Sequence, residues 1–326
     1  MIFNDKKLVR RIDELSSELK ALRTELLQKN RHLHGETWDY IKNARPRVDF
    51  ATKTLLMQMY RERAAKGDIL DFQKVAYSNY SQFCEDGVLE YIFELIGTTN
   101  KVVVEMCCGP GSECNATNLI LNNGWAGLLI DGSETNIAKA KTFFNRSLAG
   151  FRHPKLVNAW ITRGNINSLI SDNMIAGEID LFSLDVDGND YWFLEALTVI
   201  QPRVIILEAQ MLLGPDLDCS VPYDDDFVVG EHEYNGQIKH MYSGASVRAF
   251  SRLCVQKGYR LVGKVGDSSP NIIFIKNGVG EEYFPAIEVA DIFADLGAHY
   301  LDHFRGVREV SFANFDWLDL AADKTG

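Results

Sequence analysis

Three acidic side chains end two neighbouring apolar stretches, in a pattern suited to acid–base or metal chemistry. Asp185 ends the stretch 179–185, Asp187 follows it two residues later, and Glu208 ends the stretch 203–208. Strand alternation puts Asp185 and Asp187 on the same side, and open α/β sheets bind ligands at the carboxyl ends of their strands. We therefore expect the three carboxylates to face one crevice. The alternative interpretation of residues 187–190 is a plain turn and helix cap.

Two further segments are candidates for the same crevice. His240 precedes the sequence Ser-Gly-Ala-Ser, where a helix is expected to begin, and is a candidate catalytic base. A lone histidine is also common in a structural role. The loop 221–242 carries Asp224, Asp225 and Asp226 and is expected to cover the acceptor site, although a solvated acidic loop has the same composition.

A glycine turn marks a second candidate site. The β-branched residues 102–104 end in Glu105, and the small residues Cys-Cys-Gly-Pro-Gly at 107–111 lead into a helical pattern. A strand, glycine turn and helix present backbone N–H groups to a ligand and let it approach the main chain. A second apolar stretch ends in Asp131, about 20 residues on, where a ribose-binding acid is expected. The turn lacks the spaced G-x-G-x-x-G of NAD-binding proteins, which favours a different nucleotide-type ligand.

Alternating strand and helix patterns surround these residues. Strands are expected at 101–106, 127–131, 156–162, 179–185, 203–208, 259–265 and 271–277, and helices at 113–123, 134–146, 190–199 and 245–257. This alternation predicts an α/β fold with a Rossmann-like, mostly parallel seven-stranded sheet and helices on both faces. The last two strands are expected to form a hairpin, which makes that end of the sheet antiparallel.

Composition limits the class of partner. Hydrophobic residues make up 46% and charged residues 24% of 326 residues, as in ordinary globular proteins. The net charge is −11, and because residues 1–70 carry fifteen Lys and Arg against ten Asp and Glu, the rest carries −16. Such an acidic surface does not suit nucleic acid. No apolar run is long enough to span a membrane, and the first residues lack a signal-peptide core, so we expect a cytoplasmic protein.

The N-terminal segment has a heptad pattern. Its apolar positions follow alternating spacings of four and three, with Lys29 as the polar exception: Leu8, Ile12, Leu15, Leu19, Leu22, Leu26 and Leu33. Because so short a helix is marginal alone, we expect this coiled-coil-like helical extension to pair with another copy of the chain and form a homo-oligomer. Packing on its own domain is the alternative. A second helix is expected from about residue 46 to 66.

Taken together, these segments resemble the class I S-adenosylmethionine (SAM)-dependent methyltransferases, in particular the FkbM-like type and its sugar-modifying relatives. The matching pieces span residues 80–280 and are SQFCEDGVLEYIF, VVVEMCCGPGSECNATNLIL, GWAGLLIDG, AWITRGNIN, SLDVDGNDYWFLEAL, PRVIILEAQ and SGASVRAFSRLCVQKGYRLVG. The glycine turn is close to the E/D-x-G-x-G-x-G motif of this class. Cys107 takes the place of the first glycine, which crowds the turn.

The resemblance implies a set of SAM contacts. They are Glu105, Gly109, Gly111 and Asp131, with Asn165 or Ile166 near the adenine, and Gln82 with Asp86 at the start of a helix. For Gln82 and Asp86, a role in capping that helix is the alternative.

The resemblance also implies a metal site. In metal-dependent sugar O-methyltransferases, a D-x-D motif and acids after the next strand hold Mg²⁺, which lowers the pKa of a substrate hydroxyl. Here Asp185 and Glu208 would be the ligands, with Asp187 as base or third ligand. The second acid of that family is replaced by Ala209-Gln210 in this sequence, so metal-assisted and metal-free reactions both stay open.

We therefore expect a SAM-dependent O-methyltransferase that modifies a hydroxyl of a sugar, either in a nucleotide sugar or at a glycan end. The alternatives are a non-sugar O or N acceptor, a non-catalytic scaffold, and an NAD-dependent oxidoreductase. The expected domains are a heptad helix at 1–35, a helical connector at 36–70, the methyltransferase domain at 71–284 and a C-terminal extension at 285–326.

Overall fold

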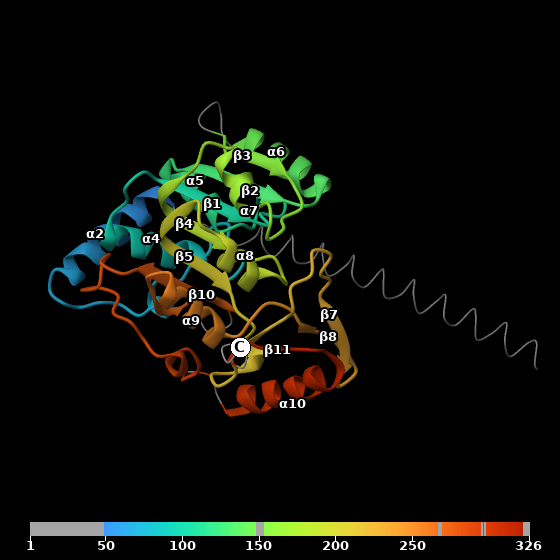
Figure 1. Ribbon diagram of the computed structural model, residues 1–326. Coiled ribbons are helices and arrows are strands. Elements are labelled where there is room, and N and C mark those ends of the chain that lie inside the picture. The colour runs from blue at the N-terminus through green and yellow to red at the C-terminus, as the bar shows by residue number, and fades with distance from the viewer. Residues whose placement is uncertain (1–48, 148–152, 267–268, 295, 297, 322–326) are drawn as a thin grey trace, which may run out of the picture. The chain divides into compact units, whose positions relative to one another are not determined.

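A seven-stranded sheet lies at the centre of the fold (Figure 1). Its strand order is β3-β2-β1-β4-β5-β10-β9. The first five of these are parallel, and β10 runs antiparallel to both β5 and β9. The strands are β1 (Val102–Met106), β2 (Ala126–Asp131), β3 (Lys155–Asn158), β4 (Gly177–Leu184), β5 (Ile200–Glu208), β9 (Tyr259–Lys264) and β10 (Asn271–Lys276). The predicted mostly parallel sheet with an antiparallel end is confirmed.

This computed structural model describes residues 49–147, 153–266, 269–294, 296 and 298–321. The heptad pattern at 8–33, and with it the predicted oligomer contact, lies outside the described residues. Among the residues that the structure does describe, no helix is long and apolar enough to cross a membrane.

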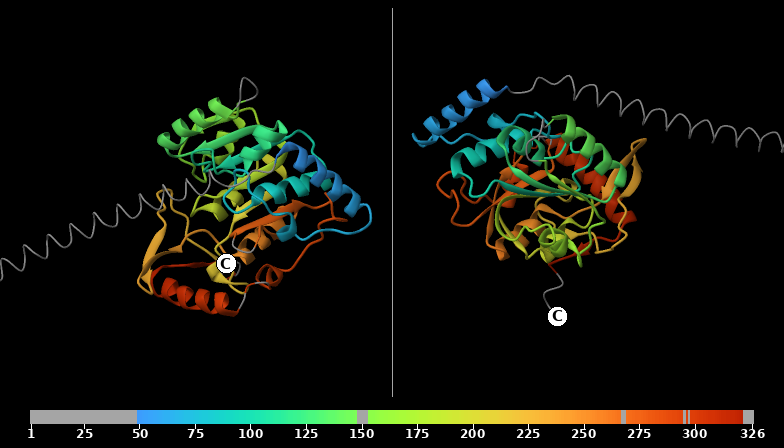
Figure 2. Two further views of the ribbon diagram at one scale, coloured as in Figure 1. Left: turned by 180° about the vertical axis from the view of Figure 1, so that it is seen from behind. Right: turned by 90° about the horizontal axis from the view of Figure 1, so that it is seen from above.

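Helices cover both faces of the sheet (Figure 2). One face carries α2 (Phe50–Ala64), α3 (Phe72–Val75), α4 (Glu85–Ile96), α5 (Ala116–Asn123) and α6 (Glu134–Ser147), and the other carries α7 (Ile166–Ser171), α8 (Asp190–Ala196) and α9 (Val247–Gln256). Successive strand residues point to opposite faces, so the buried Val103 packs with the first group and Val104 with the second. Strands buried on both faces explain why these stretches are apolar throughout.

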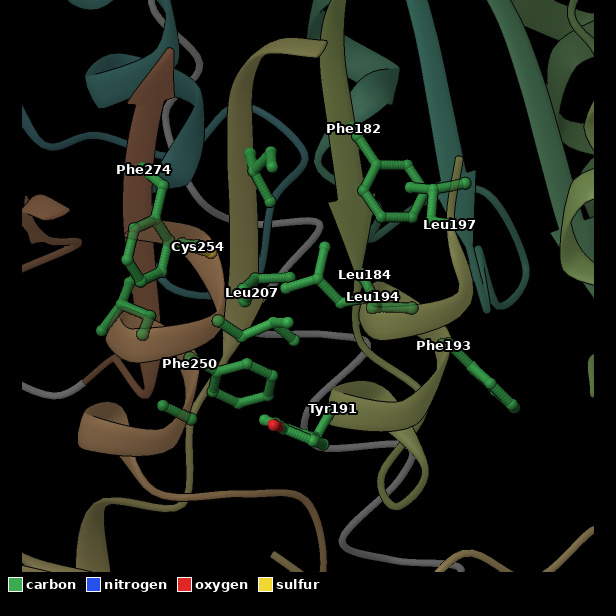
Figure 3. Packing of buried hydrophobic residues seen from close by; sticks show 14 of the residues in the cluster. Phe182, Leu184, Tyr191, Phe193, Leu194, Leu197, Leu207, Phe250, Cys254 and Phe274 are labelled. Carbon is green, nitrogen blue, oxygen red and sulfur yellow. The ribbon is translucent and has the colours of Figure 1, made fainter. Parts of the chain in front are cut away.

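The core on the α8 and α9 side is built around aromatic rings (Figure 3). Phe182 and Phe274 project from β4 and β10, while Tyr191 and Phe250 come from α8 and α9. Phe182, Phe250 and Phe274 are fully buried. This packing fixes α8 against the sheet, and α8 directly follows the acidic turn that was predicted at 185–190.

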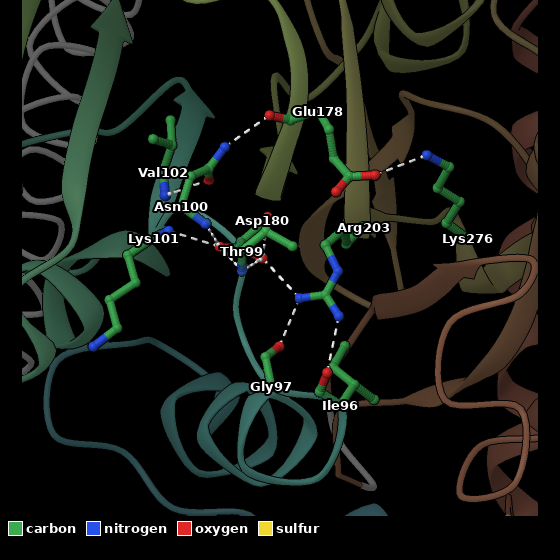
Figure 4. A network of polar contacts seen from close by, with 10 residues as sticks. All are labelled: Ile96, Gly97, Thr99, Asn100, Lys101, Val102, Glu178, Asp180, Arg203 and Lys276. Carbon is green, nitrogen blue, oxygen red and sulfur yellow. Dashed lines mark hydrogen bonds and ion pairs between the residues drawn. The ribbon is translucent and has the colours of Figure 1, made fainter.

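A buried ion pair joins the strands at the amino-terminal edge of β4 (Figure 4). The Arg203 guanidinium donates to Asp180 Oδ1 at 2.8 Å and to the carbonyl oxygens of Ile96 and Gly97 at the end of α4. The Asp180 carboxylate also accepts backbone N–H groups from residues 99–101. Despite burial, Arg203 and these N–H donors lower the pKa of Asp180. The network secures the sheet at the edge opposite the predicted sites.

The region after β5 differs from the prediction of a long loop. It contains the 3-10 helix η1 (Met211–Leu213), the short strand β6 (Cys219–Ser220) and the hairpin of β7 (Gly230–Tyr234) and β8 (Gln237–Tyr242). Asn235 and Gly236 both have positive φ, which a tight two-residue hairpin turn requires, and this pair accounts for the hairpin.

The C-terminal extension contains the short 3-10 helix η2 (Val289–Phe293) and the longer helix α10 (Ala298–Asn314). The strand β11 (Leu318–Asp319) pairs with β6, so the tail packs onto the segment that follows β5.

Candidate active site

The turn after β1 has a conformation that glycine favours. Gly109 and Gly111 have φ of +55° and +76°, and Cys107 takes a φ of +60° in the place of the first glycine. A Cβ at Gly109 would meet nothing within 4 Å, whereas a Cβ at Gly111 would lie 2.9 Å from the Phe144 ring. Gly109 therefore leaves the backbone open to a ligand, and Gly111 permits close packing of the turn on α6. For Cys107 the left-handed backbone costs about 1 kcal/mol or more.

Two buried acids hold this turn in place. The Glu105 carboxylate accepts the N–H groups of Asn115 at 2.9 Å and Ala116 at 2.7 Å, at the start of α5. Asp131 accepts the Gly109 N–H at 2.8 Å through Oδ2 and the Ser133 N–H at 2.8 Å through Oδ1. Burial raises the pKa of Glu105 to about 7, against the opposing effect of its hydrogen bonds. Both acids thus support the loop. A carboxylate oxygen that accepts one hydrogen bond can still accept a second one.

Asp86 lies in the first turn of α4, and Gln82 lies in the loop before this helix. Asp86 is buried, and its Oδ2 accepts the N–H groups of residues 79, 80 and 81 at 2.6–3.0 Å. Burial raises the pKa of Asp86 to about 7. Gln82 is exposed in the loop before α4. The Asp86 contacts organise the loop before α4. Asp86 does not cap the helix as the alternative interpretation expected, because the N-cap residue is Cys84 and no side chain makes a cap hydrogen bond there.

Asn165 and Ile166 also take structural positions. Asn165 donates to the Trp160 carbonyl oxygen at 2.9 Å and accepts the Thr162 N–H at 2.8 Å, just before α7. The side chain of Ile166 is fully buried in the core. Neither lines the cavity described next.

A cavity of about 120 Å³ lies beside the glycine turn. Its walls come from the carboxyl ends of the strands, from α8 and from one distant loop: Cys107, Gly132, Trp160, Ile161, Val186, Asn189, Phe193 and Phe227. Trp160 packs over Gly132, where a Cβ would lie 2.8 Å from its ring. The apolar and aromatic lining suits a flat heterocyclic base. Sequence reasoning matched the segment that contains Trp160 and Ile161 but assigned the contact to Asn165 and Ile166 instead.

The predicted acidic cluster forms one strand further along the sheet. Asp185, Asp187 and Glu208 bring one carboxylate oxygen each within 4.8 Å of one another. Strand register explains this, because Met106 pairs with Leu184 and Leu184 with Leu207. The glycine turn, Asp185 and Glu208 therefore follow three adjacent strands at the same level.

A buried neighbour shapes the loop that carries these acids. Asp190 accepts the Val186 N–H at 2.8 Å and the Gly188 N–H at 2.9 Å, and Asp187 between them has a φ of +56°. Residues 187–190 therefore form a turn at the start of α8, although the N-cap residue Asn189 makes no side-chain cap hydrogen bond, and the same turn contributes Asp187 to the cluster. Burial raises the pKa of Asp190 to about 7.

The cluster is electrostatically strained without a counter-charge. Burial, followed by the charge of Asp185 and a hydrogen bond with it, raises the pKa of Glu208 well above its ordinary value. Although the Asp187 side chain keeps contact with solvent, desolvation by the surrounding protein and the charge of Asp185 also raise the pKa of Asp187. An all-oxygen donor set that is partly exposed and short of positive charge fits a hard divalent cation such as Mg²⁺.

His240 is on β8 and stands apart from the three acids. Its side chain is 67% exposed, and Nε2 lies 3.0 Å from Glu231 Oε1. The charge of His240 opposes the rise in the pKa of Asp187 that burial and Asp185 cause. Gln210, at the position of the missing second acid, donates to Ser243 Oγ at 3.1 Å.

The strand order, the antiparallel β10 and the glycine turn together form the Rossmann-like, mostly parallel fold that the sequence resemblance implied. No protein-family model matches the chain, and no curated protein matches it.

Solved structures with a similar fold include SAM-dependent methyltransferases. One from Clostridium acetobutylicum is 15% identical, with a TM-score of 0.38 over 69% of this chain and 99% of that chain. Magnesium protoporphyrin IX methyltransferase from Synechocystis with bound SAM is 13% identical, with a TM-score of 0.38 over 72% and 100%. The N-terminal domain of EvdMO1, in the presence of S-adenosylhomocysteine (SAH) and D-fucose, is 13% identical, with a TM-score of 0.39 over 71% and 97%. At these low values, none of the similarities assigns a substrate to this chain.

Proposed function

We propose that this protein is a SAM-dependent O-methyltransferase that acts on a sugar hydroxyl. The observation that carries the proposal is the register of three adjacent strands. It aligns the open backbone at Gly109 with the acids Asp185 and Glu208 along one sheet edge. A cofactor site and a site for hydroxyl activation are therefore neighbours.

The cofactor side fits SAM through its shape and its polar groups. The apolar cavity beside Trp160 and Phe193 suits the adenine, and Asp131 at the end of β2 suits a ribose hydroxyl. Gly109 leaves room for the amino-acid part along the turn. Bound SAM would supply an electrophilic methyl group on its sulfonium.

The acceptor side fits a hydroxyl that must lose a proton. A carbon–sulfur bond breaks as the carbon–oxygen bond forms, SAH is the leaving product, and the hydroxyl proton passes to a carboxylate. Asp187 is the candidate for that base, since it is the exposed member of the cluster and its pKa is raised. The partly buried Asp185 and Glu208 would hold Mg²⁺, which would lower the pKa of the sugar hydroxyl.

A direct test measures SAM and SAH binding by calorimetry and then screens nucleotide sugars and glycans for labelled methyl transfer. Binding of both ligands followed by methylation of a sugar supports the proposal. Failure of both ligands to bind at about millimolar concentration would remove the methyltransferase function altogether. Binding with transfer only to amines or non-sugar hydroxyls would replace the sugar acceptor and leave the cofactor assignment intact.

A further inference from the structure

Residues 222–227, here called the roof segment, bridge two walls of the cavity. The Trp160 indole Nε1 donates to the Asp225 carbonyl oxygen at 2.8 Å, and Asn189 Nδ2 donates to the Asp224 carbonyl oxygen at 2.7 Å. Trp160 and Asn189 both line the cavity. Trp160 follows β3 and Asn189 follows β4, and these strands lie on either side of the pair β2 and β1. The segment therefore spans the space between the loop after β3 and the loop after β4.

The side chain of Phe227, the last residue of the roof segment, fills part of the space beneath it. Its ring lies so close to Gly188 that a Cβ there would be 2.3 Å from Phe227 Cδ1. Phe227 is the one cavity-lining residue that comes from the roof segment, whereas the others follow central strands or lie on α8. The roof segment thus reaches the acidic turn between Asp187 and Asn189.

The two ends of the roof segment are held very differently. At its base, the fully buried Val221 donates to the Gly244 carbonyl oxygen at 3.0 Å and accepts from Trp192 Nε1 at 2.9 Å. Tyr223 is fixed nearby, because its hydroxyl accepts the Arg163 N–H at 2.8 Å. Beyond Phe227, Val228 is 80% exposed. The base is therefore anchored in the core, and the tip is held by a few side-chain contacts.

The cavity beneath the roof segment is small. Its volume of about 120 Å³ is well below the roughly 300–1,000 Å³ of ligand pockets. The space beneath Phe227 therefore holds only part of a nucleoside-sized cofactor while the roof segment keeps this position. Most of the walls belong to the sheet edge and α8. Beyond Tyr223, the roof segment is held by hydrogen bonds of Asp224 with Asn189 and of Asp225 with Trp160, and by contacts of the Phe227 ring with Gly188 and the Tyr242 ring.

We propose that the roof segment is a lid that opens to admit the cofactor and closes behind it, with Trp160 and Asn189 as its latches. This inference rests on the proposed function for the identity of the ligand. It changes the predicted role of the loop 221–242, because the roof segment covers the cofactor cavity rather than only the acceptor site.

The test compares the kinetics of SAH binding in Trp160→Phe, Phe227→Ala and wild type by stopped-flow fluorescence. Trp160→Phe removes the latch donor but keeps an aromatic ring, and the loss of one hydrogen bond predicts about tenfold faster opening. Both the association and the dissociation rate constants of SAH should rise by about that factor, with a dissociation constant within about threefold of wild type. Trp317→Phe is the matched control, because its indole donates to Ser311 Oγ and Trp317 does not line the cavity.

A rise in the dissociation rate alone would overturn the lid, since it would mean that Trp160 or Phe227 only contacts the ligand. Hydrogen exchange provides a second measurement that needs no ligand. The Phe227 N–H, which donates to the Asp224 carbonyl oxygen at 3.1 Å, should exchange faster in Trp160→Phe than in Trp317→Phe. If SAM and SAH fail to bind, the proposed function fails, and equal exchange in the two variants would separately refute the latch.

Discussion

Asp185 and Glu208 follow directly after the paired residues Leu184 and Leu207, so their carboxylates meet at the ends of β4 and β5. A hydrogen bond between the two acids is one of the causes that raise the pKa of Glu208 well above its ordinary value. Two carboxylates this close retain a proton when no cation is present. The same pair is therefore suited to exchange that proton for a metal ion.

The raised pKa of Glu208 predicts a pH dependence of stability. Because the folded-state pKa exceeds the unfolded one, the stabilising contribution of Glu208 is complete below about pH 4 and is lost as the pH rises through the folded-state pKa. Each unit of difference corresponds to about 1.4 kcal/mol. Urea unfolding should show that Glu208→Gln is more stable than wild type near pH 8, with a smaller advantage near pH 5. A parallel pH dependence in both proteins would contradict this.

Mg²⁺ should stabilise the folded protein through the acidic cluster. At a concentration about 100 times its dissociation constant, a ligand that binds only the folded state adds about 2.7 kcal/mol. Thermal unfolding near pH 7.5 should therefore show a higher Tm for wild type with millimolar Mg²⁺ and little change for Asp185→Asn. The Glu178→Gln variant is a control, since its carboxylate pairs with Lys276 far from the cluster. An equal shift in all three proteins would indicate nonspecific binding and remove the metal site.

Two glycines of the turn should respond differently to alanine. Gly109→Ala adds a Cβ into open space and strains the backbone by about 1 kcal/mol, so the protein should fold but bind SAM at least about tenfold more weakly. Gly111→Ala adds a Cβ 2.9 Å from the Phe144 ring and should cost about 2 kcal/mol or more in unfolding free energy. Calorimetry and urea unfolding measure the two effects. Normal SAM affinity in Gly109→Ala would mean that the ligand does not approach this turn.

Asp187 and His240 should differ in their effect on catalysis. Asp187→Asn removes the proposed base and should lower kcat by about 10²-fold or more while SAM affinity is kept. His240→Ala should change kcat only a few-fold, because the imidazole is largely exposed and paired with Glu231. Steady-state methyl transfer at saturating SAM compares them. A larger loss in His240→Ala would return the histidine to the catalytic role predicted from sequence.

The buried pair of Arg203 and Asp180 should affect stability and spare the active site. Arg203→Met leaves Asp180 without its counter-charge, and breaking such a pair costs about 3–5 kcal/mol. The exposed pair of Lys276 and Glu178 provides the control, and Lys276→Met should stay within about 1 kcal/mol of wild type. Urea unfolding measures both. A cost below about 1 kcal/mol for Arg203→Met would show that the network is not needed to hold the sheet.

Local patterns predicted most of the central sheet. The apolar run that forms β4 is a pattern of residues that are neighbours in sequence, and so is a glycine that ends a helix, such as Gly97. The order of strands and helices and the antiparallel β10 were therefore predictable. Other regions depend on partners far away in the chain. The hairpin β7–β8 and the helix α10 were missed because they pack on each other and on η1, with weak periodicity of their own.

The sequence alone determined the turn at Gly109 and the acids that end β4 and β5, because residue type and alternation decide which backbone shapes and faces are possible. The tertiary structure decided what each acid does. Glu105 and Asp86 are turned toward backbone N–H groups, since a buried carboxylate needs donors. The tertiary structure also brought the Phe227 ring against Gly188. These residues are 39 positions apart, so no local pattern encodes their contact.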